Sequence, residues 1–148
     1  MRVRSAVPAD AAAVARLSGQ LGYLVAVQAL TTRLQSLVAS EEQAVYVATD
    51  ATGEVVGWIH GAEQLLVESG TRCEILGLVV DEAVRRGGIG RRLVQAVEQW
   101  ALARGLPEVS VRSAVSRAES HPFYEQLGYD RVKSQHVYRK RLAAAGAA

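Results

Sequence analysis

The hydrophobic positions of the chain follow helical spacing in some segments and strand spacing in others. The short run at 3–6, which begins with Val3 and ends with Ala6, predicts a first strand. Pro8 and Asp10 then mark a helix start, because proline suits the first helical turn and an acidic side chain suits the positive helix N-terminus. We expect this helix to run to residue 22. A second helix is predicted over 28–39, where leucines repeat at helical spacing.

Three β-rich runs follow the two helices. They cover 44–49, 54–66 and 72–80, and Asp50 with Gly53 offers a tight turn between the first two runs. Strands that follow one another through tight turns pair antiparallel. The sequence therefore predicts an antiparallel meander after the helices.

The second half of the chain alternates between helix and strand. The clearest helix spans 89–104, because its apolar residues share one face and Gly105 suits the position just after a helix end. A strand is expected over 108–113. The helix connects it to the strand at 72–80, so these two strands should lie parallel.

A last helix and a last strand complete the predicted order. The helix starts at Ser116 by capping-box spacing, or at Ser120 because Pro122 would fall beyond the first turn of the longer helix. It ends at Gly128, and a final strand is predicted over 129–139. The resulting order, βααβββαβαβ, is that of an α+β domain.

The composition limits the number of domains and the kinds of partner. With 49% hydrophobic and 22% charged residues, the chain suits one globular domain, expected over 1–142 with a frayed tail at 143–148. Cys73 is the only cysteine, so no internal disulfide is expected. A formal charge of +2 is too small to indicate nucleic acid. No apolar run predicts a membrane span or a signal peptide, so we expect a cytoplasmic protein without a membrane partner.

A loop rich in glycine and arginine, at 85–91, precedes the clearest helix. The N-terminus of that helix offers unpaired N–H groups and a positive dipole to an anion. Gly88 and Gly90 let a phosphate approach the backbone, and the arginines can pair with its oxygens. Similar turns bind dinucleotides and nucleoside triphosphates, but this loop follows a meander and lacks Gly-Lys-Ser/Thr. A simple turn with solvated arginines is the structural alternative.

These motifs resemble those of a known family. Arg85-x-x-Gly88-x-Gly90, preceded by Leu78-Val79-Val80, is similar to the Arg/Gln-x-x-Gly-x-Gly/Ala signature of the GNAT superfamily of N-acetyltransferases. The resemblance implies a mostly antiparallel sheet, splayed between strands 4 and 5 and flanked by helices. It also implies acetyl-CoA as cosubstrate, with a pantetheine arm paired like an extra strand, and no metal. The implied cofactor-binding residues are Leu78, Val79, Val80, Arg85, Arg86, Gly87, Gly88, Ile89, Gly90 and Arg91.

Acetylation of an amine needs a base for the attacking nitrogen and an acid for the departing thiolate. The sequence at 123–129 resembles the Phe-Tyr-Glu-x-Leu-Gly-Phe/Tyr segment of the family, which implies Tyr124 as the acid. A packed aromatic residue is the structural alternative. The sequence at 73–75 resembles the Ala-Glu-Ile of the histone-acetyltransferase branch, which implies Glu74 as the base.

The assignment of the base leaves alternatives open. By simple alternation, Glu74 shares a strand face with Leu76, Leu78 and Val80. A surface carboxylate is the structural alternative for this residue. The other candidates for the base are ordered water, Glu63, Glu68 and His60.

The remaining site residues are assigned partly through departures from the family pattern. Arg117 stands where the family commonly has an asparagine, seven residues before the tyrosine, and we count it among the cofactor-binding residues. His121 is expected to be structural. The acceptor pocket is predicted to include Tyr23, Trp58 and His60, which bring aromatic and polar groups together.

The function implied by the resemblance is transfer of the acetyl group of acetyl-CoA to a primary amine within a ternary complex. The acceptor stays open between small molecules, such as an aminoglycoside, a polyamine or an amino acid, and protein or peptide amines. A non-catalytic acyl-CoA sensor is the alternative from another class, and a nucleic-acid patch is disfavoured by the near-neutral charge. The resemblance is also compatible with a homodimer.

Overall fold

The computed structural model describes residues 1–85, 87–112 and 120–143 of the chain. The chain forms two compact units, Met1–Arg112 and Ser113–Ala148. The first unit contains the whole sheet and the helices that cover it. The candidate cofactor loop and the candidate base both belong to this unit.

The first unit is built on a five-stranded mixed sheet with the strand order β1-β2-β3-β4-β5. The first four strands pair antiparallel, and β4 and β5 pair parallel. Both the predicted meander and the predicted parallel pair are therefore confirmed. The strands are β1 (Arg2–Ser5), β2 (Gln43–Thr49), β3 (Val55–Leu66), β4 (Gly70–Val80) and β5 (Val109–Val111).

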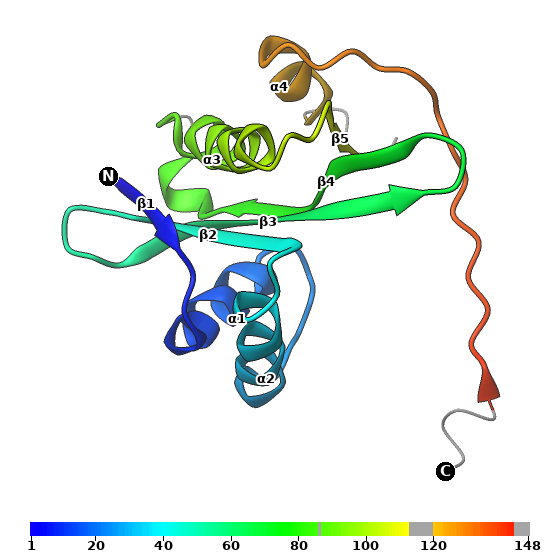
Figure 1. Ribbon diagram of the computed structural model, residues 1–148. Coiled ribbons are helices and arrows are strands. Elements are labelled where there is room, and N and C mark those ends of the chain that lie inside the picture. The colour runs from blue at the N-terminus through cyan, green and yellow to red at the C-terminus, as the bar shows by residue number, and fades with distance from the viewer. Residues whose placement is uncertain (86, 113–119, 144–148) are drawn as a thin grey trace. The chain divides into compact units, whose positions relative to one another are not determined.

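Helices cover both faces of this sheet (Figure 1). The helices α1 (Ala11–Gly19) and α2 (Val27–Val38) pack on one face, and α3 (Ile89–Ala103) packs on the other. Two glycines of β3 let α3 approach closely. A Cβ atom at Gly57 would lie 3.1 Å from Leu93 Cδ1, and one at Gly61 would lie 2.8 Å from Val97 Cγ1. Larger residues at these two positions would push α3 away from the sheet.

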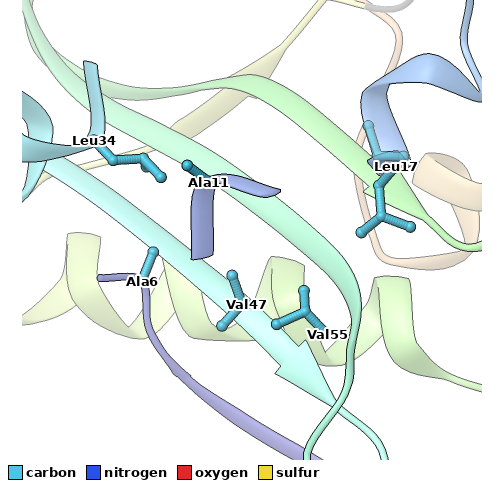
Figure 2. Close-up of a cluster of buried hydrophobic side chains, with 7 residues drawn as sticks. Ala6, Ala11, Leu17, Leu34, Val47 and Val55 are labelled. Carbon is cyan, nitrogen blue, oxygen red and sulfur yellow. The ribbon is translucent and has the colours of Figure 1, made fainter. Parts of the chain in front are cut away.

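A cluster of buried side chains fills the space between the sheet and α1 and α2. Figure 2 shows how alanines and branched aliphatic residues from the segment directly after β1, from β2 and β3, and from both helices meet there. Leu17 and Val47 are fully buried. Burial of one such side chain contributes about 1.5–3 kcal/mol to stability. The cluster consists of Ala6, Ala11, Leu17, Leu34, Val47, Val55 and Val79.

An ion pair fixes the turn between β1 and α1. The guanidinium of Arg4 donates from Nη1 and Nη2 to the two carboxylate oxygens of Asp10, both at 2.9 Å. The backbone N–H of Val7 donates to Asp10 Oδ2, also at 2.9 Å. Burial alone would raise the pKa of the Asp10 carboxyl, but these hydrogen bonds outweigh burial and hold the pKa below its ordinary value.

We predict that Asp10→Ala lowers the free energy of unfolding at pH 7 by about 2 kcal/mol, because the Arg4 guanidinium and the Val7 N–H lose their hydrogen-bond acceptor. The lowered pKa of Asp10 means that its contribution is present above the unfolded-state pKa, about 3.9, and is lost as pH falls through the lower folded-state pKa. Urea unfolding at pH 7 and at pH 3 measures both effects. Exposed Glu41, replaced by alanine, serves as the control and should change stability by less than about 0.5 kcal/mol. Equal losses in the two variants would contradict this account.

The second unit contains the helix α4 (Ser120–Gln126), which includes Pro122. The residues directly before it, among them the alternative start at Ser116, lie outside the described residues. Gly128 follows the helix with a φ of 90°, a conformation that favours glycine.

The prediction of a final strand over 129–139 is wrong. No strand occurs in the described residues after α4, and the side chains beyond Tyr129 are exposed. The physical reason lies in the alternation of this segment. Val132 and Tyr138 occupy even positions and Val137 an odd one, while charged residues occur at both. Neither set of alternate positions offers a continuous apolar face that would hold a strand on a sheet.

Candidate active site

The parallel pair of β4 and β5 is much shorter than β4 itself. β5 pairs only with Cys73–Ile75, whereas β4 continues to Val80. Beyond Ile75, β4 has β3 on one side and no strand of the described chain on the other. This splay between strands 4 and 5 confirms the predicted sheet. It leaves the backbone of Leu78–Val80 at an open edge, where an extended arm could pair with it as an added strand.

A β-bulge lies at the start of this splay. Gly61 pairs with Ile75 and His60 pairs with Gly77, so Leu76 is the extra residue of β4. A bulge bends a strand and shifts its alternation by one residue. The bend coincides with the point where β4 parts from β5.

The cofactor loop follows β4 directly. Asp81 is the first residue after the strand, and its carboxylate accepts a hydrogen bond from Ala83 N at 3.0 Å, which stabilises a short 3-10 turn at Glu82–Val84. Gly88 then has a φ of 80° and a ψ of 8°, a left-handed conformation that favours glycine, and it forms the N-cap of α3. The predicted strand–loop–helix arrangement is present, with the first backbone N–H groups of α3 available to an anion.

Arginines surround this loop. Arg85 and Arg91 are exposed, and Arg91 lies in the first turn of α3. Gly87 is also exposed, whereas Ile89 is buried and anchors the start of α3 in the core. Arg86 lies outside the described residues. The loop thus combines helix N–H groups, a left-handed glycine and two solvated guanidinium groups, which suits a pyrophosphate.

Glu74 is buried at the other end of the splay. It is 4% exposed, pairs with Ala62 of β3 and Ser110 of β5, and has Arg112 Nε 3.5 Å from its Oε1. Cys73, its neighbour, points toward α3, because its sulfur lies 3.6 Å from the Cβ position of Gly61. Side chains alternate along a strand, so Glu74 points to the opposite face.

The predicted face of Glu74 needs a correction. Simple alternation placed it with Leu76, Leu78 and Val80. The bulge at Leu76 shifts the alternation, so Glu74 shares its face with Val79 instead. Val79 belongs to the cluster between the sheet and α1 and α2. Glu74 therefore lies on the sheet face that these two helices cover elsewhere.

The rivals for the base lie in different places. The carboxylate of Glu63 accepts from Arg104 Nε at 3.1 Å, and alternation with Gly61 puts it on the α3 face. Glu68 is exposed at the turn between β3 and β4. His60 alternates with Gly61 and so lies on the face of Glu74, two residue pairs along the ladder of β3 and β4. Geometry therefore groups His60 with Glu74 and separates Glu63 and Glu68 from both.

A glutamine that the sequence did not indicate holds the His60 ring. His60 Nε2 lies 2.6 Å from Gln43 Oε1, so Nε2 carries the proton and Nδ1 is the acceptor. Burial lowers the pKa of His60, so the imidazole is neutral at pH 7. Gln43 is the first residue of β2 and directly follows polar Glu41 and Glu42, so no local pattern distinguishes it. Cys73 is no competing nucleophile, because burial raises the pKa of its thiol to about 11.

Trp58 and Tyr23, predicted in the acceptor pocket, have different surroundings. Trp58 is half-buried and packs against the cluster under α1 and α2. Its ring covers Gly77, where a Cβ atom would lie 2.7 Å from Trp58 Cη2. The indole Nε1 is buried and has no hydrogen-bond partner in the described chain. Tyr23 is 60% exposed in the loop between α1 and α2. The structure thus places Trp58 on the sheet face of His60 and Glu74, and Tyr23 at the surface.

Tyr124 lies on α4 in the second unit. Its ring meets Phe123 edge-on at a centroid distance of 5.0 Å and meets Tyr129 at 6.0 Å. These aromatic contacts hold the orientation of the ring. Arg117 and the side chain of His121 lie outside the described residues.

Neither a metal centre nor a membrane span is indicated by the described chain. Within the ranges given above, no group of three or more His, Cys, Asp or Glu side chains is arranged to hold a metal ion. No described helix is long and apolar enough to cross a bilayer.

A splayed mixed sheet that leads into a glycine-bearing anion loop is the architecture of an acyl-CoA-dependent N-acyltransferase. The model of the acetyltransferase (GNAT) family matches residues 19–129. The chain belongs to this family, and the predicted resemblance is confirmed. It is an acetyl-CoA-dependent N-acetyltransferase.

Named relatives agree with this assignment. An aminoglycoside N(6')-acetyltransferase type 1 from Stenotrophomonas maltophilia is 29% identical over 144 residues, which are 95% of this chain and 93% of the relative. A protein of the same name from Klebsiella aerogenes is 29% identical over 102 residues, 67% of each chain.

Solved structures share the fold. The aminoglycoside 6'-N-acetyltransferase AAC(6')-IG from Acinetobacter haemolyticus matches with a TM-score of 0.82 at 18% identity, over 96% of this chain and 99% of the other. The aminoglycoside N-acetyltransferase AAC(6')-Iy in complex with CoA matches with a TM-score of 0.85 at 19% identity, over 95% of both chains.

Proposed function

We propose that this enzyme acetylates a primary amine of a small polyamino molecule, with an aminoglycoside as the leading acceptor class. The observation that carries the proposal is the likeness to an aminoglycoside N(6')-acetyltransferase over 95% of this chain and 93% of that relative. A likeness of this extent includes the segments before β2 as well as the cofactor loop. Those segments supply Tyr23, which we assign to the acceptor pocket together with Trp58 and His60.

Acetyl-CoA is the cosubstrate, and we assign its pantetheine arm to the open edge of Leu78–Val80 and its pyrophosphate to the loop at 85–91. The N–H and C=O groups along that edge have no strand partner beyond Ile75 in the described chain, which supports an added extended arm. Exposed Arg85 and Arg91 and the N-terminus of α3 supply positive charge for the phosphates. Arg86 and Arg117 stay predictions as further cofactor contacts.

The chemistry that we propose is direct attack of the amine on the thioester carbonyl. Glu74 takes the proton that the ammonium must lose before its nitrogen can attack, either directly or through ordered water. The nitrogen–carbon bond forms and the carbon–sulfur bond breaks. Tyr124 gives its phenolic proton to the departing sulfur, which leaves as a thiol. The second proton that the nitrogen loses on becoming an amide returns the phenolate of Tyr124 to a phenol. Neutral His60 on the same sheet face is the second candidate for the base.

The test is release of CoA thiol with a panel of amines, namely aminoglycosides, polyamines, amino acids and a lysine peptide. We expect turnover on an aminoglycoside with a 6'-amine and none on a matched aminoglycoside with a 6'-hydroxyl. NMR of the product should place the acetyl group on that nitrogen. Turnover on the peptide alone would show that the acceptor class is protein amines and not aminoglycosides. Acetyl-CoA binding without turnover on any amine would support the sensor instead. A homodimer and a cytoplasmic location stay predictions.

A further inference from the structure

The end of α1 is joined to the end of β4 by one glutamine side chain. Gln20 Nε2 donates to Asp81 Oδ1 at 3.2 Å, and Glu82 N donates to Gln20 Oε1 at 3.0 Å. The amide group thus uses its donor and its acceptor on two consecutive residues. Gln20 is half-buried and forms the C-cap of α1. The two bonds connect positions 61 and 62 residues apart in the sequence.

Arg16 supports the same contact from one helical turn earlier. Its Nη1 donates to Asp81 Oδ2 at 3.2 Å, and its Nη2 donates to the carbonyl oxygen of Val55 at 2.8 Å. Residues four apart lie on the same side of a helix, so Arg16 and Gln20 act together. The N–H of Asp81 is also held, because it donates to Val56 O at 2.8 Å.

The Asp81 carboxylate therefore has donors on both of its oxygens. Oδ1 accepts from Ala83 N and from Gln20, and Oδ2 accepts from Arg16. The hydrogen bonds from Ala83 N and Gln20, together with Arg16, lower the pKa of Asp81. The carboxylate is ionised at neutral pH and stays an acceptor for all three donors.

This junction lies where the proposed pantetheine edge ends and the proposed pyrophosphate loop begins. Val80 is the last residue of β4, and the turn at Glu82–Val84 leads to Arg85 and Gly88. The loop residues Arg85, Gly87 and Gly88 are exposed, so side-chain packing contributes little to fixing the position of the loop. The direction in which the chain leaves β4 is set by what holds Asp81 and Glu82. Binding sites need such support to keep a ligand-binding group within about 0.5 Å of its productive place.

We propose that Gln20 is a positioning residue for acetyl-CoA. Its hydrogen bonds to the side chain of Asp81 and the main chain of Glu82 connect the end of α1 to the start of the pyrophosphate loop and fix the direction of that loop. The proposal rests on the proposed acetyl-CoA site, and it adds a residue from outside the family's loop motif. A positioning role of this kind acts on the part of the cosubstrate that contains the pyrophosphate and leaves the chemistry at the thioester unchanged.

The test compares acetyl-CoA with S-acetylpantetheine, which has the same thioester but no pyrophosphate. In the wild-type enzyme we expect acetyl-CoA to have a kcat/KM at least 100-fold higher than S-acetylpantetheine. Gln20→Leu, which keeps the size of the side chain but loses both hydrogen bonds, should raise the KM for acetyl-CoA about ten-fold. The kcat with acetyl-CoA, and both constants with S-acetylpantetheine, should stay within about two-fold. Gln20→Ala is the second variant and should behave alike.

Gln35→Leu is the matched control, because Gln35 is an exposed glutamine on α2, away from this junction. It should leave all constants within about two-fold. If wild type does not distinguish the two thioesters, the pyrophosphate site itself is wrong. If wild type distinguishes them and both Gln20 variants keep the same preference, the site stands and the positioning role of Gln20 is overturned. A loss of kcat with both thioesters would also overturn it, since a general loss of structure would then explain the result.

Discussion

Replacing Tyr124 by phenylalanine should lower kcat by about 100-fold or more, while the Kd for acetyl-CoA stays within about two-fold. The substitution removes only the phenolic oxygen. The ring keeps its edge contacts with Phe123, at 5.0 Å, and with Tyr129, at 6.0 Å, so α4 should keep its structure. Without a proton donor, the sulfur must leave as a thiolate, which raises the barrier of bond cleavage. Steady-state thiol release and titration calorimetry measure the two constants.

A second tyrosine offers the matched control for this prediction. Tyr138 is 91% exposed in the segment after α4, and Tyr138→Phe makes the same chemical change away from the helix. It should leave kcat unchanged within about two-fold. Full activity of Tyr124→Phe would remove Tyr124 from the mechanism and leave it as a packed aromatic residue. A rise in Kd with unchanged kcat would make it a binding residue instead.

The elements of the first unit could be predicted because each has a local pattern. The helix expected over 89–104 is Ile89–Ala103 in the structure, since one apolar stripe meets the sheet and Gly105 follows its end. The loop at 85–91 could also be predicted from the sequence, because a left-handed glycine and the start of a helix are determined by neighbouring residues. Patterns of this kind extend over a few residues, and they predict the local structure that those residues determine.

The features that were missed depend on residues far apart in the chain. The partners of Gln20 and Gln43 lie 61 and 17 positions away, so the local sequence does not indicate these two contacts. The face of Glu74 was assigned wrongly because the bulge at Leu76 depends on how β4 pairs with β3. The prediction of a final strand over 129–139 was wrong for a related reason. Residues of high β-propensity form a strand only where a partner strand and a continuous apolar face exist.

The second large effect is expected for Glu74→Gln, which should lower kcat/KM for the amine about 100-fold at pH 7. A glutamine has nearly the same shape as the glutamate but accepts no proton from an ammonium. The loss should shrink as pH rises toward the pKa of the acceptor amine, because the amine then arrives without its extra proton. Arg112, the partner of Glu74 at 3.5 Å, is 67% exposed and stays hydrated when the carboxylate is removed. The fold should therefore survive the substitution, which thermal unfolding checks.

Two further variants show whether a loss of activity in Glu74→Gln reflects the loss of the base. Glu63→Gln removes a carboxylate of the same strand pair that lies on the α3 face with Arg104, so the rate should stay within about two-fold. His60→Gln removes the neutral imidazole on the sheet face of Glu74 but keeps a polar side chain near Gln43. If Glu74→Gln keeps the full rate and His60→Gln loses it, the base is His60. If both keep the full rate, neither side chain takes the proton, and the ammonium must lose it to ordered water alone. A loss in Glu74→Gln that does not diminish at high pH would point to positioning of the amine and not to its deprotonation.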